Sequence, residues 1–315
     1  MTAPSAPWVV GIDVGGTGSR ARAVHLETGE VRERRSTGTS ATSSGAPRAV
    51  VEAADAAASA LQDTGKVAAV VVGASGFSTM AVGLDSTRAR VGEVLGCHVI
   101  GFAPDIFTAH VGALSDATGA VLAVGTGSIA MSRSRTGTWS TVDGWGHLLG
   151  DLGSASWIGR QGLVEALRQL DRRTTDAAAM LAAAVDRFGD PLTWPRQFAE
   201  RTDRAGVFAT FAPEVLRCAT KGDVAAIRLR DRAVDHLTDT AAAALAQPEV
   251  PPVLALTGGV FDDADFRGAL AEAVVARTGA QIVPALGSPL DGAIAIARRA
   301  AAGEQPTIDG LLEWE

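Results

Sequence analysis

The sequence predicts an α/β fold made of two related domains, with a helical insertion in the second. A turn rich in glycine and threonine occurs twice, at 14–19 and 124–128, each time between two apolar strands. Each copy continues into a strand and a Thr-Gly turn, so the same hairpin pattern repeats. A chain of 315 residues is also long for one hydrophobic core. We therefore expect α/β domains at 1–116 and 117–315, with a last helix that can pack back on the first domain.

The first half is predicted to run β-β-β-α-β-α-β-α. Apolar and alternating segments between residues 8 and 37 predict three strands, and an alanine-rich segment predicts a helix at 48–63. The segment 67–72 is continuously apolar, which is typical of a strand buried in a parallel sheet. The remaining helix, strand and helix are expected at 86–95, 97–102 and 105–114.

The second half is predicted to begin in the same way, with three strands between residues 121 and 142. A glycine-rich loop at 144–153 and a helix at 155–170 follow. Residues 174–247 are expected to be mainly helical, with breaks at glycine and proline, and they form the insertion. The chain is then expected to end in a strand, a helix, a strand and a helix at 253–256, 265–278, 281–284 and 289–302.

Charge and composition exclude several classes of protein. The net charge is −7 and no run of lysine or arginine occurs, so nucleic-acid binding is not expected. The only lysines, Lys66 and Lys221, lie outside the glycine turns, and the GxxxxGK[ST] motif is absent. The charge of a bound phosphate must therefore be met by backbone amides, arginine or a cation. No apolar run approaches ~20 residues, so no membrane span is expected.

The cysteines and the first residues predict a cytoplasmic location. Cys97 and Cys218 are far apart, which excludes a CxxC site and is typical of a reduced, cytoplasmic protein. Residues 1–8 lack a basic region followed by an apolar one, so a signal peptide is not expected. The five histidines form no group with metal-ligand spacing.

The two glycine turns are the candidate nucleotide site. Their backbone amides can bind anionic oxygens, and threonine and serine hydroxyls add donors. Ordinary hairpin turns also favour glycine, but two copies in matching context favour phosphate binding from both sides. The candidate residues are Gly15, Gly16, Thr17, Gly18 and Ser19 in the first turn, and Gly125, Thr126, Gly127 and Ser128 in the second.

Two aspartates at strand ends are candidates for catalysis and metal binding. Asp13 precedes the first turn, where a carboxylate can hold Mg²⁺ through water or stabilise the turn itself. Asp105 follows a strand and Pro104, where a general base can take a hydroxyl proton. A helix N-cap is the alternative role for Asp105, and the two roles can overlap.

The loop 144–153 is the candidate site for a sugar. Its glycines allow close approach to a ligand, and the Asp151 carboxylate can accept hydrogen bonds from sugar hydroxyls or cap the following helix. Trp145 and Trp157 can pack on a sugar face or in the core, and His147 can contact substrate or stabilise the loop. The candidate substrate-binding residues are Ser78, Thr79, Asp105, Gly144, Trp145, Gly146, His147 and Asp151.

A third glycine turn, 257–260, follows a strand in the second half. Gly258 and Gly259 allow a ligand to lie close to the backbone, which suits the adenine or ribose of a nucleotide. A bare Gly-Gly turn is weak evidence by itself. The two phosphate turns strengthen the interpretation of 257–260 as part of a nucleotide site.

Taken together, these motifs resemble the N-acetylglucosamine kinase branch of the BadF/BadG/BcrA/BcrD-type ATPase family, within the sugar kinase/actin/Hsp70 superfamily. The resemblance covers nearly the whole chain, and its most specific part lies at 144–151 and 157–162. It implies two ribonuclease-H-like domains around a central cleft that holds ATP. It also implies that 14–19 and 124–128 are phosphate motifs and that 257–260 is the adenosine motif. By the same resemblance, Asp105 matches the catalytic aspartate, Asp151 matches a sugar-binding aspartate, and the protein is a homodimer that closes on sugar.

Two departures from the family pattern bear on the substrate. Leu152 stands where the family has an acidic residue, and the loop 36–45 lacks the asparagine that contacts sugar, with Ala41 near its place. We therefore expect glucosamine as the acceptor, with N-acetylglucosamine as the alternative. The family also includes activators of acyl-CoA dehydratases that hold an iron–sulfur cluster, but Cys97 and Cys218 lie in no such motif.

The predicted function is ATP- and Mg²⁺-dependent phosphorylation of the hexosamine, at its 6-hydroxyl. Asp105 takes the hydroxyl proton, Asp13 helps to place Mg²⁺, and the glycine turns neutralise phosphate charge. Domain closure excludes water, which otherwise competes as the acceptor. A sugar-sensing protein without catalysis is the alternative of another class, and an actin-like filament protein is a third.

Overall fold

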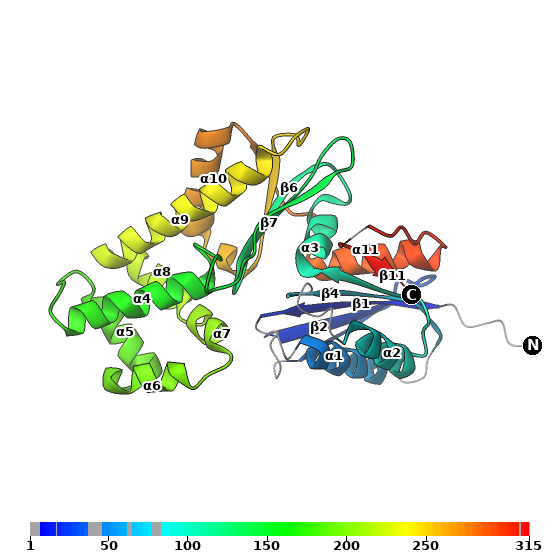
Figure 1. Cartoon of the computed structure of the whole chain (residues 1–315), viewed down its shortest axis with the longest axis horizontal. Coiled ribbons are helices and arrows are strands. Elements are labelled where there is room, and N and C mark those ends of the chain that lie inside the picture. Colours follow the sequence, from blue (N-terminus) through cyan, green and yellow to red (C-terminus); the bar gives the residue numbers. More distant parts are fainter. Residues whose placement is uncertain are drawn as a thin grey trace, which may run out of the picture. The chain divides into compact units, whose positions relative to one another are not determined.

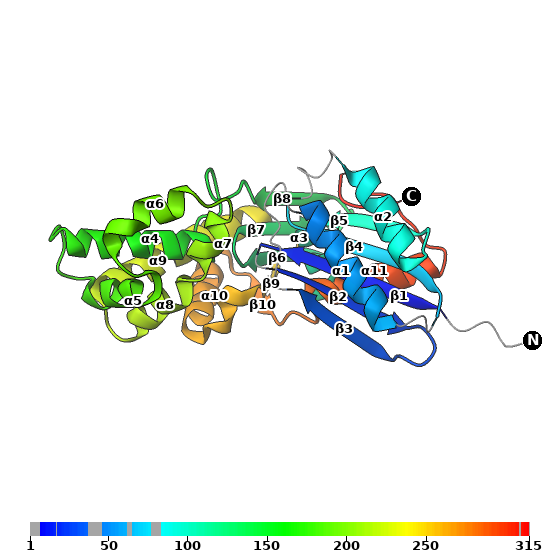
Figure 2. The same cartoon turned by 90° about the horizontal axis from the view of Figure 1, so that it is seen from below.

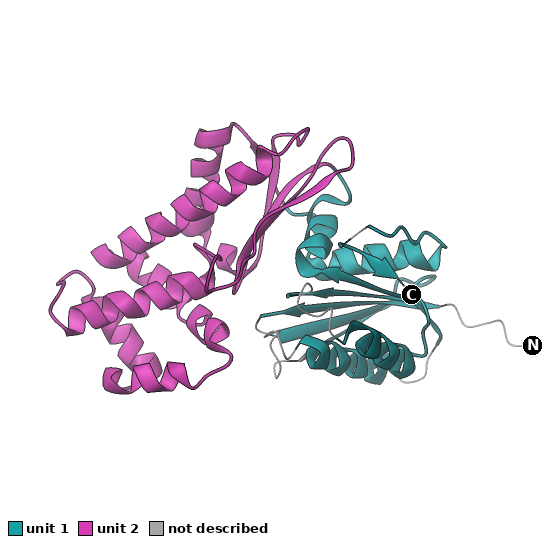
Figure 3. Cartoon of the chain, viewed as in Figure 1, with its two compact units in different colours: residues 1–117, 285–315 teal, residues 118–284 magenta. Residues whose placement is uncertain are grey.

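The computed structural model describes residues 7–16, 18–36, 46–61, 65–76, 83–308 and 310–314. The chain forms two compact units (Figure 3). Unit 1 comprises residues 1–117 and 285–315, and unit 2 comprises residues 118–284. The predicted domains, 1–116 and 117–315, place the first boundary one residue earlier and assign 285–315 to the second domain, with only its last helix able to pack back on the first.

Unit 1 begins with the predicted order β-β-β-α-β-α-β-α. Its strands are β1 (Trp8–Gly15), β2 (Gly18–His25), β3 (Val31–Ser36), β4 (Val67–Ala74), β5 (Ile100–Pro104) and β11 (Glu313–Trp314). Its helices are α1 (Ala46–Leu61), α2 (Leu84–Leu95), α3 (Asp105–Leu114) and α11 (Pro289–Ala301).

The sheet of unit 1 has the strand order β11-β5-β4-β1-β2-β3. β1, β4 and β5 are parallel neighbours, whereas β2, β3 and β11 pair antiparallel. Figure 1 shows α1 and α2 on one face and α3 and α11 on the other, and in Figure 2 α1 and α2 lie in front of the strands. Both faces are therefore covered, which explains the continuously apolar β4.

Two glycines explain why α11 belongs to unit 1. A Cβ at Gly292 of α11 would lie 1.9 Å from the Thr108 carbonyl oxygen of α3. A Cβ at Gly112 of α3 would lie 2.1 Å from the Ser288 carbonyl oxygen, just before α11. The two helices can pack this closely only because both positions lack a side chain. α11 also packs on β1 and β4, so the segment that carries it returns to this sheet.

The strand β11 was not predicted. It pairs antiparallel with β5 through Glu313 and Trp314, and the Trp314 ring lies where a Cβ of Gly101 would otherwise project. Leu312 beside it is fully buried. This short strand covers the β5 edge of the sheet.

Unit 2 has the predicted three strands, helical insertion and final β-α-β elements. Its strands are β6 (Gly119–Val124), β7 (Ser128–Arg133), β8 (Trp139–Asp143), β9 (Val253–Thr257) and β10 (Gln281–Val283), in the order β10-β9-β6-β7-β8. Its helices are α4 (Ala155–Leu170), α5 (Ala178–Phe188), α6 (Trp194–Ala199), α7 (Arg204–Ala209), α8 (Ala212–Thr220), α9 (Val224–Leu245) and α10 (Ala264–Thr278), with 3₁₀ turns η2 (Pro191–Thr193) and η3 (Gly259–Asp262).

The helix α9 connects the sheet of unit 2 to the other helices. It packs on β6, β7 and β8, and α4, α8 and α10 pack on it in turn. Trp194 and Phe211 are buried in the insertion, where Phe188 contacts both rings edge to face. The mixed α/β architecture confirms the predicted fold class.

Candidate functional site

In unit 1 the carboxyl ends of β1, β4 and β5 bring two predicted site residues together. Asp13 of β1 lies opposite Gly73 of β4, and Ala74 of β4 lies opposite Pro104, which directly precedes Asp105. The ends of parallel strands meet at one edge of a sheet, where ligands of α/β proteins bind. Asp13 and Asp105 are therefore neighbours at this edge, beside the turn between β1 and β2.

Asp105 is a half-buried carboxylate at the first position of α3. The Ser75 hydroxyl donates a hydrogen bond to its Oδ2. Burial raises the pKa of the Asp105 carboxyl above its ordinary value, and the negative charge of Asp13 raises it further, while the bond from Ser75 opposes both. A raised pKa makes the carboxylate a stronger base, as a proton acceptor in catalysis requires.

Close packing fixes the start of α3 on β4. A Cβ at Gly73 would lie 2.4 Å from Thr108 Oγ1, so glycine lets the first turn of α3 approach the strand. The Thr108 hydroxyl is fully buried and donates to the Asp105 carbonyl oxygen at 2.9 Å. The backbone that carries the Asp105 carboxylate is thereby held on two sides.

Asp13 is paired with an arginine. The register of the β1–β2 hairpin places Asp13 opposite Arg20, and Arg20 Nη2 lies 2.7 Å from Asp13 Oδ2. The Asp13 side chain is 12% exposed and the Arg20 side chain 37% exposed. The carboxylate predicted to hold a metal thus lies beside a partly exposed guanidinium at the first glycine turn.

The second glycine turn, in unit 2, connects β6 to β7 and lies against the start of α4. The Gly125 amide donates to the Gly127 carbonyl oxygen at 2.9 Å and closes the turn. The amides of Ala155 and Ser156, the first two residues of α4, donate to the carbonyl oxygens of Gly125 and Thr126 at 3.0 and 3.2 Å. The first amides of α4 are thus satisfied by the turn.

Asp151 lies against this turn. Its Oδ1 accepts a hydrogen bond from the Ser128 amide at 3.2 Å, and a Cβ at Gly127 would lie 2.9 Å from its Oδ2. Its own amide donates to Asp143 Oδ1 at 3.2 Å. The helix α4 is capped instead by Ser154, whose hydroxyl accepts from the Trp157 amide, so the alternative role of Asp151 as the cap is wrong.

The rest of the predicted sugar loop is largely exposed. The Trp145 side chain is 76% exposed, and Gly144 and Gly146 have φ angles of 80° and 81°. His147 and Asp151, by contrast, line a small hollow together with Gly150, Ser156, Trp157, Arg160 and Phe208. Partial burial and then the charges of Arg204 and Arg160 lower the pKa of His147, so its ring is neutral near pH 7.

Trp157 packs in the core rather than on a ligand. Its side chain is buried among the apolar residues of unit 2, its ring meets His236 edge to face at 5.1 Å, and the Arg232 guanidinium lies over it. The core alternative for this tryptophan is therefore the one observed.

Gly258 lies beside the second turn. Its φ angle is 112°, and a Cβ there would lie 2.3 Å from the Val124 carbonyl oxygen, one residue before the turn. Gly259 begins the 3₁₀ turn η3. The structure thus brings the predicted adenosine turn and the second phosphate turn together within unit 2.

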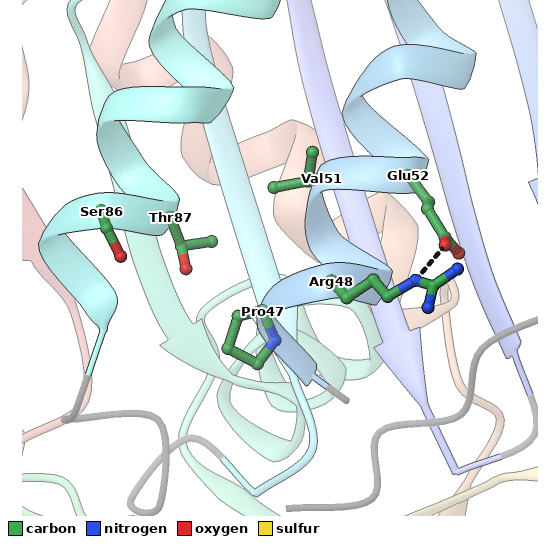
Figure 4. Close-up of a pocket in the computed structure, with 6 residues that line it drawn as sticks. All are labelled: Pro47, Arg48, Val51, Glu52, Ser86 and Thr87. Carbon is green, nitrogen blue, oxygen red and sulfur yellow. Dashed lines mark hydrogen bonds and ion pairs between the residues drawn. The ribbon is translucent and has the colours of Figure 1, made fainter. Parts of the chain in front are cut away.

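Three predicted residues, Thr17, Ser78 and Thr79, lie outside the described residues, as does Ala41. Figure 4 shows an open hollow between α1 and α2 of unit 1, lined by Pro47, Arg48, Val51, Glu52, Ser86 and Thr87. No described residue of the predicted site lines it.

The described residues contain neither a metal cluster nor a membrane-spanning helix. No group of three or more His, Cys, Asp or Glu side chains in this part of the chain could hold a metal ion. Within the same residues, no helix has the length and apolar character needed to cross a membrane.

Sequence reasoning missed several residues that the structure adds to these sites. Ser75 lies in the loop after β4, and its position at a strand end is the signal that could have identified it. Arg20 could have been identified from the hairpin, because the antiparallel pairing of β1 and β2 places it opposite Asp13. Arg160 lines the hollow from α4, and its place within 157–162, part of the most specific stretch of the resemblance, is the signal that could have identified it.

Comparisons with known proteins support a kinase-like fold. The chain is 25% identical to a candidate N-acetylglucosamine kinase of Chromobacterium violaceum, with a TM-score of 0.69 over 92% of this chain and 99% of that one. A candidate N-acetylglucosamine kinase of Porphyromonas gingivalis has the same fold, with a TM-score of 0.70, 18% identity and coverage of 91% and 97%.

A segment of 69 residues is 36% identical to the N-acetylmuramic acid/N-acetylglucosamine kinase of Clostridium acetobutylicum. This match spans 22% of the chain and 22% of that relative. The wider match is to the model of the BadF/BadG/BcrA/BcrD ATPase family, which covers residues 10–297. The chain therefore belongs to the BadF/BadG/BcrA/BcrD ATPase family, as its motifs predict.

Proposed function

We propose that this chain is an ATP-dependent kinase that phosphorylates a hexosamine at its 6-hydroxyl. N-acetylglucosamine is the preferred acceptor in this proposal. Membership of an ATPase family supports the use of ATP. The observation that carries the proposal is the pair of carboxylates in unit 1, where Asp105 with its raised pKa lies beside Asp13 and the first glycine turn. A sugar hydroxyl that receives the phosphoryl group must lose its proton, and a base at this edge of the sheet can take it.

In this proposal Asp105 orients the acceptor hydroxyl and accepts its proton as the new O–P bond forms and the bond to the ADP oxygen breaks. Phosphoryl transfer needs little covalent chemistry from a protein, so positioning and charge stabilisation dominate. The bond from Ser75 orients the Asp105 carboxylate, and the packing of Gly73 on Thr108 holds its backbone. The amides of both glycine turns are the donors for phosphate oxygens.

Magnesium fits the residues that are present. Mg²⁺ keeps several waters and is bound by one or two carboxylates together with substrate phosphates, so it needs no cluster of protein ligands. Asp13 is a partly buried carboxylate at the first turn, and its pairing with Arg20 orients it. When bound, Mg²⁺ would neutralise phosphate charge, with Asp13 holding it directly or through water.

The choice of acceptor rests on the relatives. The sequence departures at Leu152 and Ala41 point to glucosamine, whereas the Chromobacterium relative is a candidate N-acetylglucosamine kinase and the Clostridium relative is an N-acetylmuramic acid/N-acetylglucosamine kinase.

The test is ADP release from Mg·ATP with N-acetylglucosamine, glucosamine or glucose, and NMR identification of the phosphorylated hydroxyl. Turnover that requires N-acetylglucosamine and gives the 6-phosphate supports the proposal. Turnover on glucosamine alone would keep the kinase and restore the acceptor predicted from the sequence. Sugar binding without ADP release would favour the sugar-sensing alternative.

A further inference from the structure

The residue that sequence similarity assigns to the sugar is bonded to the nucleotide turn. Asp151 Oδ1 accepts from the Ser128 amide, and its Oδ2 lies 2.9 Å from the position that a Cβ of Gly127 would take. We propose that Asp151 is a positioning residue that holds the second phosphate turn in its nucleotide-binding shape. This inference rests on the proposed function, because it assumes that this turn binds the phosphates of ATP.

The opposite side of the turn is fixed by α4. The amides of Ala155 and Ser156 bind the carbonyl oxygens of Gly125 and Thr126. In a trans peptide the N–H of the next residue points away from the carbonyl oxygen. The amides of Thr126 and Gly127 therefore point away from α4, and they meet no acceptor among the described residues. These two amides are the donors available to an anionic oxygen.

Asp151 holds the end of the same turn. Its bond to the Ser128 amide fixes the residue that follows Gly127, so the turn is held at both ends, by α4 and by the carboxylate. Asp151 is only 9% exposed. A buried carboxylate needs hydrogen-bond donors, and the Ser128 amide is one of them. Because this amide is bonded to Asp151, it does not compete with the amides of Thr126 and Gly127 for a ligand.

The backbone at Asp151 also indicates a fixed role. Its φ angle is 56°, in the left-handed region that aspartate and asparagine adopt more readily than other side chains. Asp143 has a φ angle of 64°, and its Oδ1 accepts a hydrogen bond from the Asp151 amide. The Leu152 carbonyl oxygen accepts from the Ser128 hydroxyl at 3.3 Å, so residues 151 and 152 both bind Ser128. Hydrogen bonds thus join the predicted sugar loop directly to the second phosphate turn.

Two substitutions separate the carboxylate from the backbone conformation. Asp151→Asn keeps both the left-handed backbone and a side-chain oxygen that can accept from Ser128. Asp151→Gly keeps the left-handed backbone and removes the acceptor. Asp171→Asn is the control, because Asp171 lies at the other end of α4 and pairs with Arg173 at the surface.

The experiment measures the Kd of Mg·ADP by calorimetry without sugar, with circular dichroism to verify folding. We expect Asp151→Gly to raise the Kd about 10-fold, the loss of one hydrogen bond to a charged group, and Asp151→Asn and the control to stay within about 3-fold. If the glycine variant does not fold, Gly127→Ala displaces the carboxylate instead, and the same loss is expected.

An unchanged Kd in folded Asp151→Gly would overturn the inference. If the KM for sugar rose in that variant while the Kd of ADP stayed constant, Asp151 would return to the sugar role that the sequence predicts. A wild-type protein that binds no ADP would instead overturn the proposed function, and this inference with it.

Discussion

The two glycine turns share a sequence pattern but differ in what surrounds them. The turn of unit 1 joins β1 to β2 and lies beside two carboxylates, one paired with Arg20 and one half-buried at the start of α3. The turn of unit 2 joins β6 to β7 and lies against the amides of α4, with Asp151 bonded to its end.

This difference indicates a division of labour between related hairpins. In unit 1 the side chains at the turn are ionisable, so this unit can supply the base and the metal-binding carboxylate. In unit 2 the side chains and α4 fix the turn itself, so this unit can supply oriented amides. Changes at the first turn should therefore affect chemistry, and changes at the second should affect nucleotide affinity.

The largest effect is expected at the half-buried carboxylate of unit 1. Asp105→Asn removes the proton acceptor while keeping an oxygen for the Ser75 hydroxyl, so kcat should fall about 10²–10⁴-fold with the Kd of Mg·ADP unchanged. Steady-state kinetics and calorimetry measure the two quantities. Asp85→Asn is the control, because Asp85 also lies in the first turn of a unit 1 helix but its side chain is 95% exposed. A near-normal kcat in Asp105→Asn would show that Asp105 is not the general base.

A smaller effect is expected where α11 supports α3. Gly292→Ala would place a Cβ 1.9 Å from the Thr108 carbonyl oxygen, and the helices must separate. We expect a loss of about 1–3 kcal/mol in unfolding free energy, together with reduced kcat, because α3 carries Asp105. Gly268→Ala in α10 is the matched control, since its Cβ would meet no atom of the described residues within 4 Å. Denaturant unfolding that shows equal stability for both variants would contradict this packing.

The smallest effect compares the turns directly. Gly127→Ala must push away the Asp151 carboxylate, 2.9 Å from the new Cβ, whereas among the described residues a Cβ at Gly15 would meet only the Gly18 carbonyl oxygen, at 3.9 Å. Without ligand, we expect Gly127→Ala to lower stability by about 1 kcal/mol and Gly15→Ala to have little effect. Thermal unfolding of the two variants measures this. A larger loss for Gly15→Ala would reverse the comparison.

The sequence predicted the parts of the fold that depend on neighbouring residues. The helix α4 runs from Ala155 to Leu170 as expected, because a glycine-rich loop precedes it and Ser154 caps it. The start of α3 at Asp105 was likewise predicted from the strand and proline before it. Such local signals act within a few residues, so they can be read without the fold.

Contacts between distant residues could not be predicted in this way. Asp151 meets Ser128 across 23 positions, and Ser75 meets Asp105 across 30, because strand order and helix packing bring them together. The return of α11 to unit 1 depends on Gly112 and Gly292, two small residues whose pairing no local pattern reveals. Short β11 was missed because two residues show no periodicity.

The most direct test of Asp105 as the base is the pH dependence of kcat at saturating Mg·ATP and N-acetylglucosamine. Protonation removes the base, so kcat should fall as the pH drops through the pKa of Asp105. Because burial and Asp13 raise that pKa, the acid limb should lie above the ordinary carboxyl value of about 3.9. The residual activity of Asp105→Asn should lack this limb. A limb that survives in Asp105→Asn, or a wild-type kcat that stays flat down to about pH 4, would contradict the account.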